Sequence, residues 1–332
     1  MSLTVNNQIF YSSSTNYLQL PTGTDLQKPT QSTGGMVRYN ATSHNLEFFG
    51  GNIQQPVATV WRDVNYYVAP PGEVVYTSPG SFVWSPPMGV YRISIVCVGA
   101  AQKGGGGLGW INNYPVSPGD TYLINVGSPS GSTLSERSSF FISTSTVAGF
   151  GATNSTGGTY YAPSGGGGNG GNGGSDSGGG AGGYTGNGGY GGSYSGYNNR
   201  AGAIGYPGGA GAGGGGGGGG GPYVIYYSTY PNYGVLRYTG DAGAGGGVGL
   251  YGQGASGNGG AGSSNLEVAY PGTGGSNGNP GSSTRIGGSP YGGGAYNGGM
   301  YGGGGGGYAG IGGSGAVRVI WGAGRSFPYN AT

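Results

Sequence analysis

The chain has 332 residues, of which 91 are glycine and 19 proline; only 6% are charged, and the formal net charge is +2. This balance excludes an electrostatic nucleic-acid binder, which needs clustered Lys and Arg. Runs of glycine break the strict Gly-X-Y period and exclude collagen. No window approaches the 18 apolar residues of a membrane span. The first residues lack the basic start and apolar stretch of a signal peptide, so we expect synthesis in a cytoplasm without standard export and no membrane insertion.

Strand patterns dominate the first part of the chain. Residues 36–40 and 46–49 are strand-like and flank the polar segment 41–45, which predicts a hairpin. Ahead of them, 18–24 resembles a short strand and a turn. We therefore predict a small β module over 1–64.

A second strand-rich region covers 65–160. Its predicted strands alternate in polarity or are continuously apolar, and Pro-Gly and Pro-Pro turns separate the first of them. They span 73–76, 81–84, 91–98, 121–127 and 139–142. One more strand pattern, 315–321, follows the glycine-rich half. Because a lone strand has no partner, we expect 316–332 to return to the sheet begun at 73–98, which would make the glycine-rich half an insertion.

Glycine dominates the segment between these strands. After residue 150 the chain contains 73 of its 91 glycines, and 213–221 is an unbroken run of nine. Disordered segments are usually charged and poor in aromatics, whereas this chain has 29 tyrosines. We therefore predict that 161–315 forms a bundle of packed polyglycine-II helices, in which each N–H bonds to a neighbouring rod and a Cβ inside would separate the rods. Outer rods can carry a side chain at every third residue, a spacing that 167–174 shows.

The predicted fold class is thus all-β plus polyglycine-II helices, with almost no α-helix: a small β module, then a β-sandwich-like domain with a large inserted glycine bundle. We predict that the run 213–221 is a central rod of this bundle. The substitution Gly217→Val is expected to disrupt folding of the glycine-rich half.

Residues for catalysis are scarce. His44 is the only histidine and falls in the predicted hairpin turn, while the nine carboxylates are scattered. The glycine runs lack the Gly-Lys-Ser/Thr ending of a phosphate-binding loop. The only cysteine, Cys97, lies in an apolar strand pattern and reads as a buried residue. We expect no enzyme activity, no metal and no cofactor.

Tyrosine is concentrated in the segment 222–238. Rigid amphipathic tyrosines give a large contact area at low entropic cost, which suits a recognition surface. The equal alternative is a hairpin that covers apolar parts of the rods or packs on a neighbouring subunit. The candidate receptor-binding residues are Tyr223, Tyr226, Tyr227, Tyr230, Tyr233, Arg237 and Tyr238. A second cluster with the same ambiguity consists of Tyr160, Tyr161, Tyr184, Tyr190, Tyr194, Tyr197 and Tyr206.

Three stretches resemble phage tail-fibre and receptor-binding proteins. Residues 20–24 (Leu-Pro-Thr-Gly-Thr), followed by 34–40 and 46–49, look like the small N-terminal β module of phage fibre proteins. Residues 81–90, leading into glycines, are similar to the start of glycine-rich virion domains. The ending 315–328 looks like that of structural proteins of cyanobacterial phages.

The glycine-rich half is similar in style to the polyglycine-sandwich adhesins of T-even-type phages, although the N-terminal module differs from theirs. The resemblance implies a tail fibre or adhesin of the virion, in which 1–64 attaches or trimerises. It implies a homotrimer that contacts other virion tail proteins and a host surface glycan or outer-membrane protein.

Three other interpretations remain open. The first is a purely structural neck or baseplate fibre without a receptor. The second is an ice-binding glycine-helix bundle, and the third is a disordered Gly/Tyr protein that forms condensates. Ice-binding bundles of this type are usually stapled by disulfides, which one cysteine cannot form.

Overall fold

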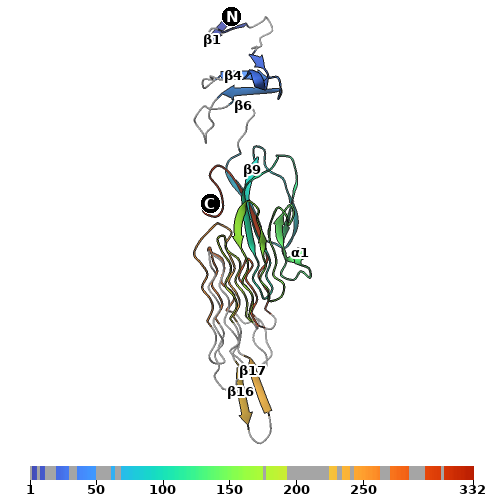
Figure 1. The fold of residues 1–332 in the computed structure, drawn as a ribbon, viewed down its shortest axis with the longest axis vertical. Coiled ribbons are helices and arrows are strands. Elements are labelled where there is room, and N and C mark those ends of the chain that lie inside the picture. Colours follow the sequence, from blue (N-terminus) through green and yellow to red (C-terminus); the bar gives the residue numbers. More distant parts are fainter. Residues whose placement is uncertain are drawn as a thin grey trace. The chain divides into compact units, whose positions relative to one another are not determined.

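The computed structural model describes residues 2–5, 8–11, 20–29, 36–49, 61–63, 69–174, 177–192, 224–229, 234–239, 243–261, 270–283, 296–307 and 310–332. Its chain forms two units, Met1–Ala69 and Pro70–Thr332 (Figure 1). Strands predominate in both, and α1 (Leu134–Arg137) is the only α-helix among the described residues. The expectation of an all-β fold with almost no α-helix is therefore confirmed.

Unit 1 contains a four-stranded sheet in the order β3-β4-β5-β6 and a separate pair, β1-β2. Strands β4 and β5 flank residues 41–44 and form the hairpin that the sequence predicts. A short 3-10 turn follows β3, and β3 runs parallel to β4. The elements are β1 (Ser2–Val5), β2 (Gln8–Tyr11), β3 (Thr22–Gly23), the 3-10 turn (Asp25–Gln27), β4 (Met36–Asn40), β5 (Asn45–Phe49) and β6 (Trp61–Asp63).

Unit 2 contains two antiparallel five-stranded sheets, ordered β15-β10-β9-β18-β7 and β14-β13-β12-β11-β8. A further pair, β16-β17, is joined to neither sheet. The strands are β7 (Gly72–Tyr76), β8 (Gly80–Trp84), β9 (Arg92–Val98), β10 (Leu108–Pro115), β11 (Tyr122–Val126), β12 (Ser139–Phe141), β13 (Val147–Gly149), β14 (Tyr160–Tyr161), β15 (Gly165–Gly168), β16 (Val224–Thr229), β17 (Gly234–Thr239) and β18 (Ala316–Trp321).

Strand β18 lies inside the first sheet, between β9 and the edge strand β7, although it comes from the end of the chain. It pairs with β9 on one side, where Val317 lies opposite Cys97, and with β7 on the other, where Val317 lies opposite Tyr76. The other four strands of this sheet precede most of the glycine-rich segments in the chain, and β18 follows these segments and pairs between β9 and β7.

Both faces of β9 are covered, which explains why its apolar residues run continuously instead of alternating. On one face, Val96 and Val98 pack in a buried cluster with Tyr184 and Leu250 from the glycine-rich part and with Phe327 from the C-terminal segment. On the other face, β9 and β18 contact β12 of the second sheet. This strand therefore separates two interiors of different composition.

Glycine segments form the second of these interiors, and their backbone hydrogen bonds follow a period of three. Segment 178–183 donates to three neighbours in rotation. Its first and fourth residues donate to 243–246, its second and fifth to 103–106, and its third and sixth to 186–189, with N···O distances of 2.7–3.0 Å. Such a segment bonds to neighbours in three directions, whereas a β-strand bonds only to two.

These segments lie so close together that side chains are excluded between them. A Cβ on Gly105 would lie 2.0 Å from the carbonyl oxygen of Gly180, and one on Gly171 would lie 1.9 Å from that of Gly189. Real Cβ atoms essentially never come within 3.0 Å of such a neighbour. Glycine is required at these positions because there is no space for a Cβ atom. The nine-glycine run 213–221, with Gly217, lies outside the described residues.

Candidate functional site

The tyrosine-rich segment forms a two-stranded antiparallel hairpin of β16 and β17. Tyr226 lies opposite Arg237, Tyr227 opposite Leu236, and Tyr238 opposite Ile225. The hairpin brings four of the seven candidate receptor-binding residues onto adjacent strands. Figure 1 labels its two strands, β16 and β17.

The other three candidates, Tyr223, Tyr230 and Tyr233, lie outside the described residues, as does the tip 230–233 that joins the strands. Among the strands that the structure describes, none other than β16 and β17 joins this ladder. A two-stranded hairpin is only marginally stable alone in water.

The second tyrosine cluster does not form one site. Tyr184 is only 1% exposed, stacks on Phe327 at 5.7 Å between ring centroids, and donates its hydroxyl to the carbonyl oxygen of Gly249. Burial raises the pKa of the Tyr184 hydroxyl, so this residue is part of the core. Tyr160 is half-buried, whereas Tyr161 and Tyr190 are exposed. Tyr194, Tyr197 and Tyr206 lie outside the described ranges.

Asparagines complete the hydrogen bonding at an edge of the glycine segments. Asn169 and Asn172, at the three-residue spacing seen in the sequence, are both exposed. The Oδ1 atom of Asn172 accepts from the backbone N–H of Gly157 at 2.9 Å, and that of Asn187 accepts from the N–H of Asn169 at 2.9 Å. A side-chain carbonyl thus replaces the missing carbonyl of a further segment.

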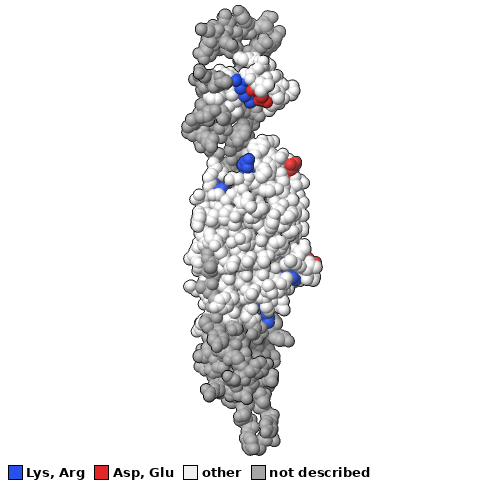
Figure 2. Space-filling view, viewed as in Figure 1, with Lys and Arg blue, Asp and Glu red and all other residues white. Residues whose placement is uncertain are grey.

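Charge is sparse around these features. On the face shown in Figure 2, the described surface of unit 2 carries only a few separate charged groups. Three exposed tyrosines, Tyr190, Tyr251 and Tyr270, come from glycine-rich segments. An uncharged surface with aromatic side chains suits neutral, hydroxyl-rich ligands better than polyanions.

A buried ion cluster, which the sequence analysis missed, fixes the C-terminal segment. Arg318 on β18 is fully buried and contacts Glu73 of β7 at 2.6 Å; its other bonds go to the carbonyl oxygens of Leu250 and Ala331 at 2.9 and 2.7 Å. Arg325 contacts the same Glu73 oxygen at 2.7 Å. Hydrogen bonds from both arginines, first from Arg318, hold the pKa of Glu73 below its usual value.

Only one clue in the sequence pointed to this cluster. Arg318 interrupts an otherwise apolar strand pattern, and buried charges are usually paired. The cluster joins β7, β18, a glycine-rich segment and the C-terminal segment, so its role in this structure is to hold these four parts together.

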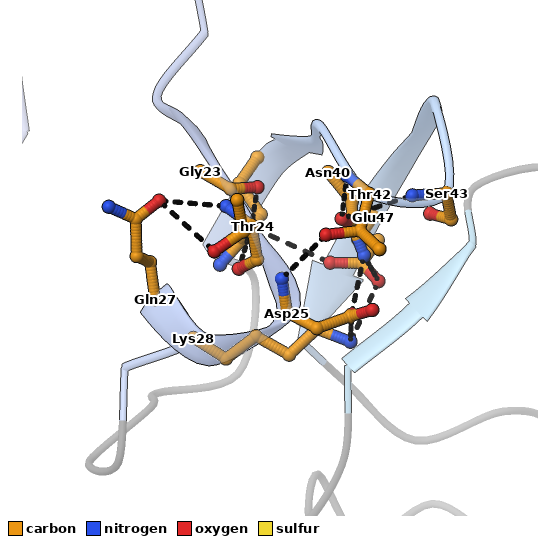
Figure 3. A network of polar contacts seen from close by, with 10 residues as sticks. Gly23, Thr24, Asp25, Gln27, Lys28, Asn40, Thr42, Ser43 and Glu47 are labelled. Atoms are coloured by element: carbon orange, nitrogen blue, oxygen red, sulfur yellow. Dashed lines mark hydrogen bonds and ion pairs between the residues drawn. The ribbon is translucent and has the colours of Figure 1, made fainter.

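A second polar network lies in unit 1. Lys28 contacts Asp25 at 2.8 Å and Glu47 at 3.0 Å, and the Nδ2 atom of Asn40 donates to both carboxylates at 2.8 Å (Figure 3). The hydrogen bond from Lys28, followed by that from Asn40, lowers the pKa of Asp25, and the bond to Asp25 raises that of Lys28. Both groups are therefore stabilised in their charged forms.

His44 and Cys97, the only histidine and the only cysteine of the sequence, lie apart from both polar networks. His44 lies exposed in the β4–β5 turn, with its Nδ1 atom 3.4 Å from the hydroxyl of Tyr39. Cys97 is buried, as its apolar neighbours predict, and burial raises the pKa of its thiol. Within the described residues, no three His, Cys, Asp or Glu side chains gather as metal ligands. The described helices include none long and apolar enough to cross a membrane.

No protein-family model, curated protein or solved structure matches this chain.

Proposed function

We propose that this protein is a non-enzymatic tail fibre or adhesin of a virion, made in the host cytoplasm, that attaches the particle to the host cell surface. The glycine segments form a polyglycine-II bundle inserted into a β-sandwich-like domain, and the bundle is a rigid support for the β16–β17 hairpin. Unit 1 joins the protein to other virion tail proteins and brings the copies together as a homotrimer.

One observation carries this proposal. Segment 178–183 hydrogen-bonds in rotation to three neighbouring segments, a period of three that fits the three residues per turn of polyglycine II. A flexible linker would not form such bonds, because the conformational entropy lost on ordering each residue costs about 1–2 kcal/mol and glycine is at the high end. A bundle ordered at that cost is suited to hold a recognition hairpin at a fixed place.

The hairpin is the proposed contact with a host surface glycan or outer-membrane protein. Its Tyr226 and Tyr227 lie on β16 opposite Arg237 and Leu236 of β17. Tyrosine rings stack on the faces of sugars, and their hydroxyl groups hydrogen-bond, without the entropic cost of longer side chains. An arginine on the facing strand adds planar donors for a polar ligand.

The test replaces Tyr226, Tyr227 and Tyr230 by alanine in the full-length protein and measures adsorption of the purified protein to host cells. We expect at least a tenfold loss of binding with unchanged thermal unfolding. Tyr329→Ala is the matched control, because this exposed tyrosine belongs to the C-terminal segment and to neither of the two tyrosine clusters. Adsorption by the triple variant equal to that of the wild type would remove the hairpin from the contact.

The alternative function is that of a purely structural neck or baseplate fibre. The Arg318 cluster fits this role equally well, since it fastens four parts of unit 2 together. Absence of any binding by the wild-type protein to its host cells would favour this alternative.

A further inference from the structure

Six Asn-Gly pairs occur in the sequence, and all of them lie in glycine-rich segments that the structure describes. Asparagine is thermolabile, and most of all before glycine, which has no side chain to hinder a reaction of its backbone nitrogen. At these asparagines the chain can therefore change chemically without an enzyme. They are Asn169, Asn172, Asn187, Asn258, Asn277 and Asn297.

The reaction joins the backbone nitrogen of the glycine to the Cγ atom of the asparagine before it. As this carbon–nitrogen bond forms, the bond from Cγ to the amide nitrogen breaks, and that nitrogen leaves as ammonia with the proton of the glycine N–H. Water then opens the cyclic imide at either carbonyl, which gives aspartate or isoaspartate. The glycine N–H must therefore be free to lose its proton, and the asparagine side chain must be free to turn toward it.

Backbone hydrogen bonds hold five of the six glycine nitrogens. The N–H of Gly173, for example, donates to the carbonyl oxygen of Ser155 at 2.7 Å. Such a bond has to break before the nitrogen can attack, and in a packed segment it breaks only when the segment opens locally. The five glycines are Gly170, Gly173, Gly188, Gly278 and Gly298, with N···O distances of 2.7–2.9 Å.

Three of the asparagine side chains are held as well. The Oδ1 atoms of Asn172 and Asn187 accept from neighbouring segments, and that of Asn297 accepts from the N–H of Ile311 at 3.1 Å. A side chain bonded in this way cannot turn toward the following nitrogen without losing its hydrogen bond.

The pair Asn258–Gly259 has neither form of protection. Asn258 is exposed, and neither its side chain nor the N–H of Gly259 bonds to any residue within the described ranges. Only the backbone of Asn258 is held, because its carbonyl oxygen accepts from the N–H of Thr273 at 3.0 Å and its N–H donates to the Oγ1 atom of Thr273 at 2.7 Å. Both groups that react are therefore free in the folded chain.

We propose that Asn258 is a site of spontaneous covalent modification in the folded protein, and that the glycine segments protect the other five asparagines from the same reaction. The local sequence does not distinguish Asn258, because Asn169, Asn172 and Asn187 have the same Gly-Asn-Gly-Gly context. The difference lies in the hydrogen bonds of the folded chain.

The modification changes the segment 255–261 at a residue that anchors it. Every third carbonyl oxygen of this segment, from Ala255, Asn258 and Ala261, accepts from an N–H of 270–276. Isoaspartate adds a carbon atom to the backbone and breaks this period of three, and both products add a carboxylate to a segment without charged residues. The reaction therefore weakens one edge of the glycine segments and makes it negative.

Peptide mapping of the full-length protein by mass spectrometry tests this assignment. The protein is incubated at 37 °C and pH 8, and chymotrypsin then cuts at Tyr251 and Tyr270, which separates Asn258 from the other Asn-Gly pairs. We expect Asn258 to become the acid at least tenfold faster than Asn172 and Asn187, whereas in denaturing urea the three rates should be equal. Equal rates in the folded protein, or the same difference in urea, would overturn the assignment.

The variant Asn258→Gln provides a second measurement, because glutamine cyclises far more slowly than asparagine. The isoaspartate content of the incubated protein, counted by enzymatic methylation, should fall at least tenfold in this variant. Asn187→Gln is the matched control in the same sequence context and should keep the wild-type content. If Asn258→Gln accumulates as much isoaspartate as the wild type, the modified residue is not Asn258.

Discussion

The paired sheets and the glycine segments of unit 2 meet along β9 but fill their interiors with different atoms. Between the sheets, side chains such as Phe141 and Ile124, both fully buried, occupy the space. Between the glycine segments, backbone carbonyls occupy it, and a Cβ would overlap them. The first interior tolerates no loss of side-chain volume, and the second tolerates no gain. A smaller side chain should therefore destabilise the region between the sheets, and an added side chain should destabilise the glycine segments.

The largest effect is expected from Gly245→Val in the glycine segments. Gly245 donates to the carbonyl oxygen of Gly304 at 2.8 Å and accepts from the N–H of Gly299 at 3.0 Å. A Cβ there would lie 2.1 Å from the carbonyl oxygen of Gly179. Overpacking and the loss of both backbone bonds should lower the free energy of unfolding by more than about 5 kcal/mol. Thermal unfolding and resistance to protease measure the loss.

Gly119→Asn is the control for this substitution. A Cβ on Gly119 has no atom within 4 Å, and asparagine tolerates its φ of +93° better than most residues. We expect wild-type unfolding. If the Gly245 variant is as stable as this control, close packing of the backbone is not what requires glycine in this region.

The complementary change is Phe141→Ala between the sheets. Phe141 is fully buried and its ring lies 5.6 Å from Tyr122, 5.7 Å from Tyr114 and 6.3 Å from Trp84. Removing it leaves a cavity, which should lower the free energy of unfolding by about 3–5 kcal/mol in chemical denaturation. Phe140→Ala on the same strand is the matched control, because Phe140 is only half-buried. Equal losses in the two variants would contradict a side-chain core at β12.

Sequence reasoning found the strands whose patterns are long and regular. It identified the strand at 91–98 and the returning strand at 315–321, because long apolar runs predict buried strands. It missed β10, where Asn112 and Asn113 interrupt the apolar pattern, the register shifts between Ile111 and Tyr114, and Asn113 has a φ of +56°. It also missed β15, which consists of glycine alone and pairs with β10.

The sequence predicted where the candidate site lies along the chain, but not how its residues are arranged. A hairpin was one of two interpretations of 222–238 that the sequence left open, and the register that places Tyr226 opposite Arg237 is visible only in the structure. Tyr184 and Tyr190 each follow two glycines, yet Tyr184 is buried and Tyr190 exposed. What separates them is the C-terminal Phe327, which stacks on Tyr184. Such a contact between distant segments leaves no local signal.

An intermediate effect is expected at the cluster where the two interiors are joined to the C-terminal segment. Glu73→Gln should lower the free energy of unfolding by about 1–3 kcal/mol at neutral pH, because Arg318 stays buried without its anion. The folded state lowers the pKa of Glu73 below its ordinary value of 4.5. This stabilisation is therefore complete above pH 4.5 and is lost as the pH falls through the folded pKa.

Denaturation at a series of pH values from 7 to 2 checks both points. The difference between wild type and Glu73→Gln should shrink as the pH falls below 4.5. Asp120→Asn removes an exposed carboxylate of the same unit and should track the wild type at neutral pH. A constant difference across the whole series would show that Glu73 acts through packing and not through its charge.

The smallest effect is expected at the edge of the glycine segments, where side chains replace the backbone carbonyls of a missing neighbour. Asn172→Ala removes the acceptor of the Gly157 N–H, which is only half-buried and can bond to water instead. The loss should be about 1 kcal/mol, with faster hydrogen exchange at the Gly157 amide. Asn172→Asp keeps an oxygen at the same position and should preserve the protection. If alanine and aspartate speed the exchange equally, the side-chain oxygen does not complete this edge. Hydrogen bonding to the neighbouring glycine segments would then not explain the regular spacing of asparagine in 167–174.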